Sequence, residues 1–234
     1  MRRFAALMIL VAPLPAQAQE NPGQQEVIVT GMRRDIDGYE AGMPAVGLQR
    51  RADFAVQQIT INGDTRDADK RREEIYAMVR AALMIAPKRG VELAQGDTVV
   101  EPLTLDNYTS LSLKKDSRPD ADKVSFLVKT PLGPNVDLRA AEARIAAFVK
   151  AVPPVGRALM ETSDEIALSV VRPDQYRGEI IAKVADDARF MAAKFGDGYA
   201  VEAQGVERPV EWARASLTDV LLYIPYKLTV VPKR

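Results

Sequence analysis

The fold is decided by residues 53–85, whose sequence is DFAVQQITINGDTRDADKRREEIYAMVRAALMI. The first nine residues alternate imperfectly between apolar and polar side chains, which is typical of a β-strand with one buried face. The alternation changes register between Val56 and Ile59, and this change predicts a β-bulge. The turn residues 62–65 then lead into a segment with helical periodicity. A strand that passes directly into an amphipathic helix is the first indication of a mixed α and β fold.

The predicted helix covers residues 66–85. Asp64 or Thr65 is expected to cap its N-terminus, and Pro87 is expected to end it. Its buried stripe falls at helical spacing and consists of Ile75, Met78, Val79, Ala82, Leu83 and Ile85. The charged run at 69–74 is interpreted as a solvated face with ion pairs between successive turns, and not as a binding site.

Similar patterns predict the elements of the remaining chain. We expect strands at 26–31, 123–130, 158–171, 199–206 and 220–231, an irregular strand or bent pair at 91–113, and helices at 136–149 and 173–195. We expect loops at 32–49, 114–122 and 208–216. The small residues on one face of helix 173–195 favour close packing on a sheet. The order β-β-α-β-β-α-β-α-β-β predicts an α+β domain over residues 26–234, with mostly antiparallel sheets against about three helices.

The N-terminus has the pattern of a cleavable export signal. The pattern consists of Arg2-Arg3, the apolar run 4–12 and the small residues of Ala16-Gln17-Ala18. The apolar run is too short to span a bilayer. We therefore expect a signal peptide at 1–18, a mature N-terminus near Gln19 and a disordered polar leader at 19–25. These features predict a periplasmic protein, with association with the outer membrane as a further expectation.

The composition excludes several classes of chemistry. The chain contains no cysteine and no histidine, so disulfides, thiolate nucleophiles, Cys/His zinc sites and a Ser-His-Asp triad are all excluded. No phosphate-binding glycine motif and no calcium-loop spacing is present, so we expect no cofactor and no metal. The 32 basic and 32 acidic residues are balanced, which argues against a nucleic-acid partner. No apolar run after the signal is long enough to span a membrane.

Several segments together resemble the SIMPL domain family, also called DUF541, of bacterial envelope proteins. The run Glu26-Val27-Ile28-Val29-Thr30-Gly31 is similar to the first strand of that family, and residues 53–85 match the strand and long helix that follow. The Ala-rich helix ending near Gly198 and the closing strand 221–230 are similar as well. The resemblance covers most of residues 26–231. It departs from the family pattern at residues 32–51, which intervene after the first strand. The resemblance implies an envelope protein, often oligomeric, with no catalytic residues to transfer.

Two sequence features are candidates for partner binding. Glu26, Val27, Ile28, Val29 and Thr30 resemble the energy-coupling box of TonB-dependent receptors, an extended peptide that adds a strand to a partner sheet. The alternative, which we favour, is that this strand pairs within its own sheet. Trp212 lies among charged residues and would suit stacking against a sugar, but a lone tryptophan more often anchors a segment onto the core.

The sequence therefore favours an exported, non-catalytic envelope protein that acts by self-association or by binding an envelope partner. Uncovered strand edges would provide the association surface. One rival hypothesis is a hydrolase of cell-wall material that uses carboxylates in a deep cleft. Another is a peptide-presenting accessory of an outer-membrane transporter, which would use residues 26–30.

Overall fold

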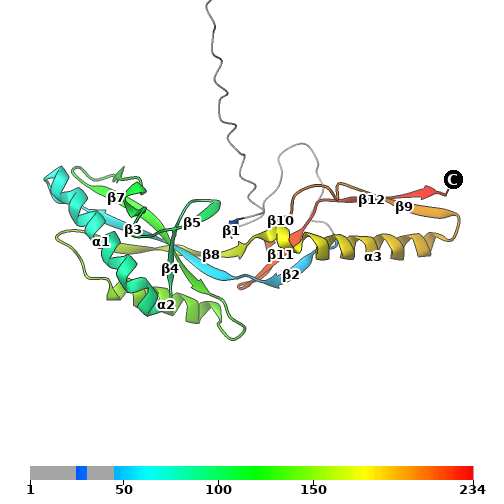
Figure 1. The fold of residues 1–234 in the computed structure, drawn as a ribbon, viewed down its shortest axis with the longest axis horizontal. Helices are drawn as coiled ribbons and strands as arrows, with labels where there is room; N and C mark the ends of the chain where they lie inside the picture. The colour runs from blue at the N-terminus through cyan, green and yellow to red at the C-terminus, as the bar shows by residue number, and fades with distance from the viewer. Residues whose placement is uncertain (1–24, 31–44, 234) are drawn as a thin grey trace, which may run out of the picture.

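The computed structural model describes residues 25–30 and 45–233 (Figure 1). The predicted signal peptide, leader residues 19–24 and most of the predicted loop at 32–49 lie outside the described residues. Within them, the α-helices are α1 (Ala68–Arg89), α2 (Leu138–Ala151) and α3 (Arg177–Phe195). The strands are β1 (Glu26–Val29), β2 (Leu48–Arg51), β3 (Phe54–Gly63), β4 (Glu92–Gln95), β5 (Val99–Pro102), β6 (Lys114–Lys115), β7 (Asp122–Pro131), β8 (Leu159–Val171), β9 (Tyr199–Gln204), β10 (Glu211–Arg214), β11 (Asp219–Tyr223) and β12 (Lys227–Pro232). Helices combined with antiparallel sheets confirm the predicted α+β class.

Six strands form a closed ring because β3 has a neighbour on each side. β3 pairs with β7 and with β8, and the pairing continues from β8 through β1, β5 and β4 back to β7. All of these pairs are antiparallel, and we call the six strands the strand ring. The predicted bulge is confirmed, because the register of β3 against β8 shifts between Gln57 and Ile59. The two-residue strand β6 adds to β7 within the predicted hairpin loop 114–122.

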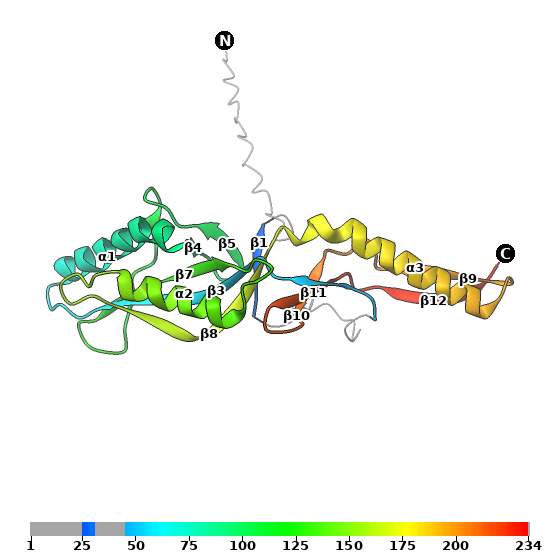
Figure 2. The ribbon, with the colours of Figure 1, turned by 90° about the horizontal axis from the view of Figure 1, so that it is seen from below.

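Helices α1 and α2 cover the outer surface of the strand ring at one end of the molecule (Figure 2). The core between them is formed by apolar side chains of α1, α2, β3 and β7, among them Ile59, Ile61, Ile75, Met78, Val124, Phe126, Ile145 and Phe148. Each such side chain, when fully buried, contributes about 1.5–3 kcal/mol relative to an exposed one. No α-helix in the described residues is long and apolar enough to cross a bilayer.

Both ends of α1 differ from the prediction. Asp67 caps the N-terminus, because its carboxylate accepts the backbone N–H three residues later at 2.8 Å. Asp64 binds Arg157 instead, and the Thr65 hydroxyl is donated to Glu74. Pro87 does not end the helix. It lies in the last turn, and the helix continues to Gly90, whose left-handed φ of 65° provides the C-cap.

A second sheet lies beside the ring and consists of β10, β11 and β2 in that order. Two predicted loops are corrected here, because β2 begins within the predicted loop 32–49 and β10 lies within 208–216. Both strands have four residues, and β2 has a largely polar sequence, so neither has the alternating pattern of a longer strand. The predicted strand 220–231 is divided into β11 and β12 around Pro225.

The opposite end of the molecule is an arm that consists of α3, β9 and β12 (Figures 1 and 2). Arg177, at the start of α3, donates hydrogen bonds to the backbone carbonyls of Val206 and Arg208. Burial and then the negative charge of Asp187 raise the pKa of Tyr226 to about 12, so Tyr226 keeps the proton that it donates to Asp187 at 3.2 Å. These contacts join the helix to the ends of the two strands.

The expectation that the small-residue face of α3 is core is wrong for most of its length. The buried residues of α3 are Ile180 and Val184, both in its first half. From there on the helix has only the two-stranded ribbon beneath it, and a ribbon of this size is too narrow to bury the helix face. A short 3-10 turn at Pro173–Tyr176 precedes α3, so the helix begins at Arg177.

Glu74 of α1 accepts hydrogen bonds that hold the start of β8 against the helix. Its carboxylate accepts the hydroxyl of Thr65 at 2.6 Å and the backbone N–H of Arg157 at 3.2 Å. These two hydrogen bonds, in that order of size, lower the pKa of Glu74 below its usual value. Gly156 approaches the same carboxylate closely with a φ of 55°, and a Cβ at this position would lie 2.2 Å from Glu74.

We predict that Gly156→Ala destabilises the protein by about 2 kcal/mol or more, because the residue would combine a left-handed backbone with a collision against a hydrogen-bonded carboxylate. Urea unfolding measures this loss. The matched control is Gly178→Ala in α3, where a Cβ meets nothing within 4 Å. This control should be neutral or stabilising by about 0.5 kcal/mol. Equal stability of the two variants would contradict the prediction.

Candidate functional site

The interior of the strand ring contains a small apolar cluster that is separate from the core under α1 and α2. The cluster comprises Ile28, Val56, Ala94, Val100 and Ala167, with Phe54 and Leu127 packed against it. These residues alternate with those that face the helices, as the period of two in a strand requires. The ring is therefore filled with side chains in its middle, and its two ends differ.

One end of the ring is closed by a buried ion pair. The ammonium group of Lys129 on β7 donates to the carboxylate of Glu26 on β1, and the Ser169 hydroxyl on β8 donates to the same carboxylate at 2.6 Å. The lysine nitrogen lies 4.1 Å from the ring centroid of Phe54 and 3.4 Å from a carboxylate oxygen of Glu92. Lys129 is only 5 % exposed. This cluster connects three strands of the ring through charge-assisted hydrogen bonds.

The same cluster brings together a serine, a lysine and a glutamate, which are groups that support nucleophilic catalysis in other proteins. Ser169 is fully buried, and its hydroxyl donates to Glu26. A substrate has no route to this oxygen in the described structure. We therefore interpret the cluster as a structural ion pair.

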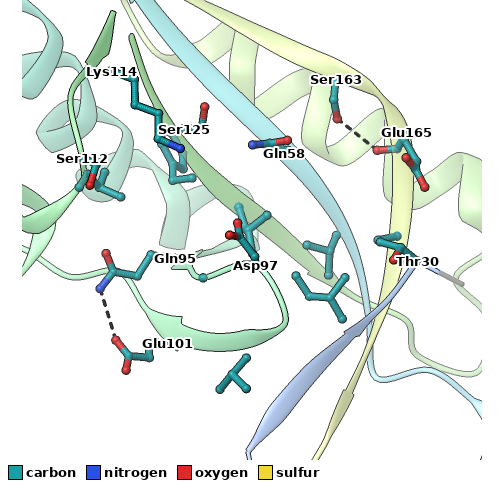
Figure 3. A pocket seen from close by; sticks show the side chains of 18 of the residues that line it. Thr30, Gln58, Gln95, Asp97, Glu101, Ser112, Lys114, Ser125, Ser163 and Glu165 are labelled. Carbon is teal, nitrogen blue, oxygen red and sulfur yellow. Dashed lines mark hydrogen bonds between the residues drawn. The ribbon is translucent and has the colours of Figure 1, made fainter. Parts of the chain in front are cut away.

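The other end of the ring opens into a cavity of about 640 Å³, which we call the ring mouth (Figure 3). Its polar lining residues come from β3, β7, β8, the end of β1, the β4–β5 hairpin, and β6 with the segment that leads into it. They are Thr30, Gln58, Gln95, Asp97, Glu101, Ser110, Ser112, Lys114, Ser125, Ser163 and Glu165. Its apolar lining includes side chains of the ring interior, such as Ile28, Val56 and Ala167. The ring mouth is therefore a polar rim above an apolar floor.

Charged groups occupy different sides of the ring mouth. Figure 3 shows Lys114 and Ser125 on one side, Glu165 on the other, and Asp97 between them. This arrangement follows from topology, because β3 separates β7 from β8 in the ring. Glu101 is engaged by the Gln95 amide at 3.4 Å. Among the described residues, no group of three acidic side chains is placed to hold a metal ion.

The residues predicted to bind a partner lie in three separate environments of the structure. Strand β1 contains Glu26 to Val29 and pairs with β8 on one side and with β5 on the other, as the favoured alternative anticipated. Thr30 lies at the ring mouth. Trp212 is on β10, is 3 % exposed and packs in the core between the second sheet and α3. Its ring therefore contacts the core and is not available for stacking against a sugar in this conformation.

The sequence analysis did not identify the ring mouth, because its residues come from six separate segments. The sequence does contain one indication of the ring mouth, namely polar residues at positions that face the ring interior, such as Gln58 on β3 and Ser125 on β7. Without knowledge that the strands close into a ring, these residues indicate only an irregular alternation.

No protein-family model matches the chain, and no curated protein is detectably similar to it. Membership of the SIMPL family therefore stays a prediction. Two solved structures from Listeria innocua align weakly. One is a hydrolase, with 16 % identity, a TM-score of 0.17 and coverage of 80 % of this chain and 94 % of that chain. The other is an uncharacterized conserved protein, with 15 % identity, a TM-score of 0.15 and coverage of 78 % and 92 %. Similarity at this level establishes neither a shared fold nor a function.

We predict that Glu26→Gln destabilises the protein by about 3 kcal/mol, because the buried Lys129 would lose its closest counter-charge. Replacing both partners, in Glu26→Gln with Lys129→Met, should recover most of the loss. Urea denaturation of the two single variants and the double variant measures the coupling between the residues. The control is Glu92→Gln, since Glu92 is exposed and its contribution should be below about 1 kcal/mol. A Glu26→Gln variant as stable as the wild type would show that the pair does not hold the ring together.

Proposed function

We propose that the protein is an exported, non-catalytic component of the cell envelope that acts by self-association through the arm. The predicted export signal at residues 1–18 supports the location. The single observation that supports association is the arm itself, which projects from the body with its strand edges uncovered and with aromatic side chains exposed.

Among the described residues, the ribbon of the arm has two free edges. β9 and β12 pair with each other over six residues, and neither pairs with another strand in the part of the chain that the structure describes. Each strand therefore presents one row of unpaired backbone N–H and C=O groups. Such an edge is a template for pairing with another chain unless the protein covers it.

The arm also exposes large apolar side chains. Phe190 is 61 % exposed, and Phe195 and Tyr199 are exposed as well, with their two ring centroids 6.4 Å apart. The ammonium group of Lys194 lies 5.1 Å from the Phe190 ring. Aromatic side chains are enriched among the residues that dominate binding energy at protein interfaces. Their concentration on a projecting element favours docking over a role in folding.

A second copy of this chain is the partner that fits these edges best. β9 carries the exposed residue Glu202, and β12 carries the exposed residue Lys227, so the two edges of one ribbon differ in charge. In a register that sets Lys227 of β12 opposite Glu202 of β9 in the next copy, the contact gains an ion pair that neither β9 with β9 nor β12 with β12 can form. Because each copy keeps a second free edge, this head-to-tail contact leads to rings or open chains rather than closed dimers.

We predict that the exported form, with an N-terminus at Gln19, forms assemblies larger than a dimer and that Phe190→Ser with Phe195→Ser shifts their dissociation midpoint at least tenfold in concentration. The reason is the loss of about 2 kcal/mol or more at an aromatic hot spot. Light scattering across a dilution series measures the assembly mass of the wild-type protein and of the double variant.

The matched control is Met84→Ser on α1, which has the same exposure as Phe190 but lies at the other end of the molecule. Its assembly should equal that of the wild type. A wild-type protein that stays monomeric at every concentration, or an equal effect of the control, would contradict the proposal.

A carboxylate-based hydrolase is the second candidate, because Asp97, Glu101 and Glu165 all line the ring mouth. This candidate requires that the protein hydrolyses a wall-derived compound and that this activity is lost in Asp97→Asn or Glu165→Gln. The peptide-presenting hypothesis requires β1 to leave the ring, since both of its edges are paired.

A further inference from the structure

We propose that the ring mouth binds a small zwitterionic ligand, namely a short peptide with free ends, whose carboxylate contacts Lys114 and whose ammonium group contacts Asp97 and Glu165. This site is separate from the arm and does not depend on self-association.

The cavity has the size and lining of a ligand site. Its volume of about 640 Å³ lies within the range of roughly 300–1,000 Å³ that small-molecule sites occupy. The floor is apolar and belongs to the packed interior of the ring, so it is fixed by the strands around it. The rim carries the polar groups, and this combination of an apolar base with a few polar groups is typical of binding sites.

Among the described residues, three charged groups of the rim are free to bind a ligand, whereas Glu101 accepts a hydrogen bond from Gln95. Lys114, Asp97 and Glu165 form no ion pair or side-chain hydrogen bond with any residue that the structure describes, although other charges nearby are paired. The adjacent Lys115 binds Asp122 at 3.0 Å, and Lys123, opposite Lys114 on β7, binds Asp116 at 3.5 Å. Lys114 is thus the cation left for a ligand on its side of the ring mouth.

The separation of the charges selects a zwitterion. Lys114 extends from β6 on the β7 side, whereas Glu165 is on β8, with β3 between them. A ligand with a single anionic group would meet Lys114 but also face the carboxylate of Glu165, and a neutral sugar would form no charge-assisted contact with any of the three. A molecule with a carboxylate at one end and an ammonium group at the other satisfies both sides with charge-assisted hydrogen bonds.

The uncharged rim groups suit the middle of such a ligand. Gln58 on β3 lies between the charged sides, and Ser125 on the adjacent strand β7 lies beside Lys114 and shares a hydrogen bond with Thr60. Amide and hydroxyl groups both donate and accept hydrogen bonds. Peptide bonds need one donor and one acceptor per residue. A short peptide therefore finds partners along its length as well as at its ends.

Isothermal titration of the exported form with trialanine, N-acetylated trialanine and trialanine amide tests this proposal. We expect the free peptide to bind and each blocked peptide to bind about tenfold more weakly, because each block removes one charge-assisted contact. Binding of all three with equal affinity, or binding of a neutral disaccharide in preference to trialanine, would overturn the proposal, as would the absence of any heat for trialanine up to millimolar concentration.

Two variants test which residue binds each end of the peptide. Lys114→Gln should bind free trialanine about tenfold more weakly and should no longer discriminate against trialanine amide, whereas Glu165→Gln should lose discrimination against the acetylated peptide. Lys115→Gln is the control, because its side chain binds Asp122 and does not line the ring mouth. Urea unfolding of each variant verifies folding. An effect of Lys115→Gln equal to that of Lys114→Gln would contradict the assignment, and the assembly state measured in parallel separates this result from any failure of the arm.

Discussion

The structure depends on the pairing of the short strand β1 on both of its edges. Without β1, the strands β8 and β5 would each keep a free edge, and the strand ring would open into a curved sheet. The closure uses few backbone contacts, because β1 has four residues and matches β5 at only two positions. The buried pair of Glu26 and Lys129 adds a contact that joins β1 to β7 across the interior of the ring. This pair therefore determines where the N-terminal strand is placed.

Two buried charged clusters have related roles at different places in the body. Besides the Glu26 cluster, Arg71 of α1 binds Asp122 of β7 at 2.6 Å, with Arg71 only 2 % exposed. Burial acts to raise the pKa of Asp122, but hydrogen bonds from Arg71 and Lys115 outweigh it and hold the pKa below its usual value. Removing two charges from water is costly, so such pairs add little net stability compared with apolar residues of the same shape. Their effect is to penalise arrangements in which a partner is missing, and this fixes the positions of β1 and α1 relative to β7.

The sequence predicted the elements with long regular patterns and missed those without them. Strand β3, its bulge and the helix that follows were recognisable because an apolar stripe extends over many residues. β2 and β10 were missed because four residues cannot establish a period and, unlike β1, neither strand contains β-branched residues. The ring mouth was not predictable because it depends on the pairing of β3 with both β7 and β8, which are far apart in the chain. The face of α3 was misread because small residues suit both close packing and exposure on a projecting arm, and only the narrow ribbon beneath decides between them.

The central claim is that β1 is locked within the strand ring of the folded protein. Amide hydrogen exchange of the protein, followed residue by residue, tests it directly. The account predicts that Val27, Ile28 and Val29 exchange as slowly as the central residues of β3, since opening them requires breaking the ring. Exchange of these three amides at the rate of an unfolded chain, while β3 remains protected, would contradict the account.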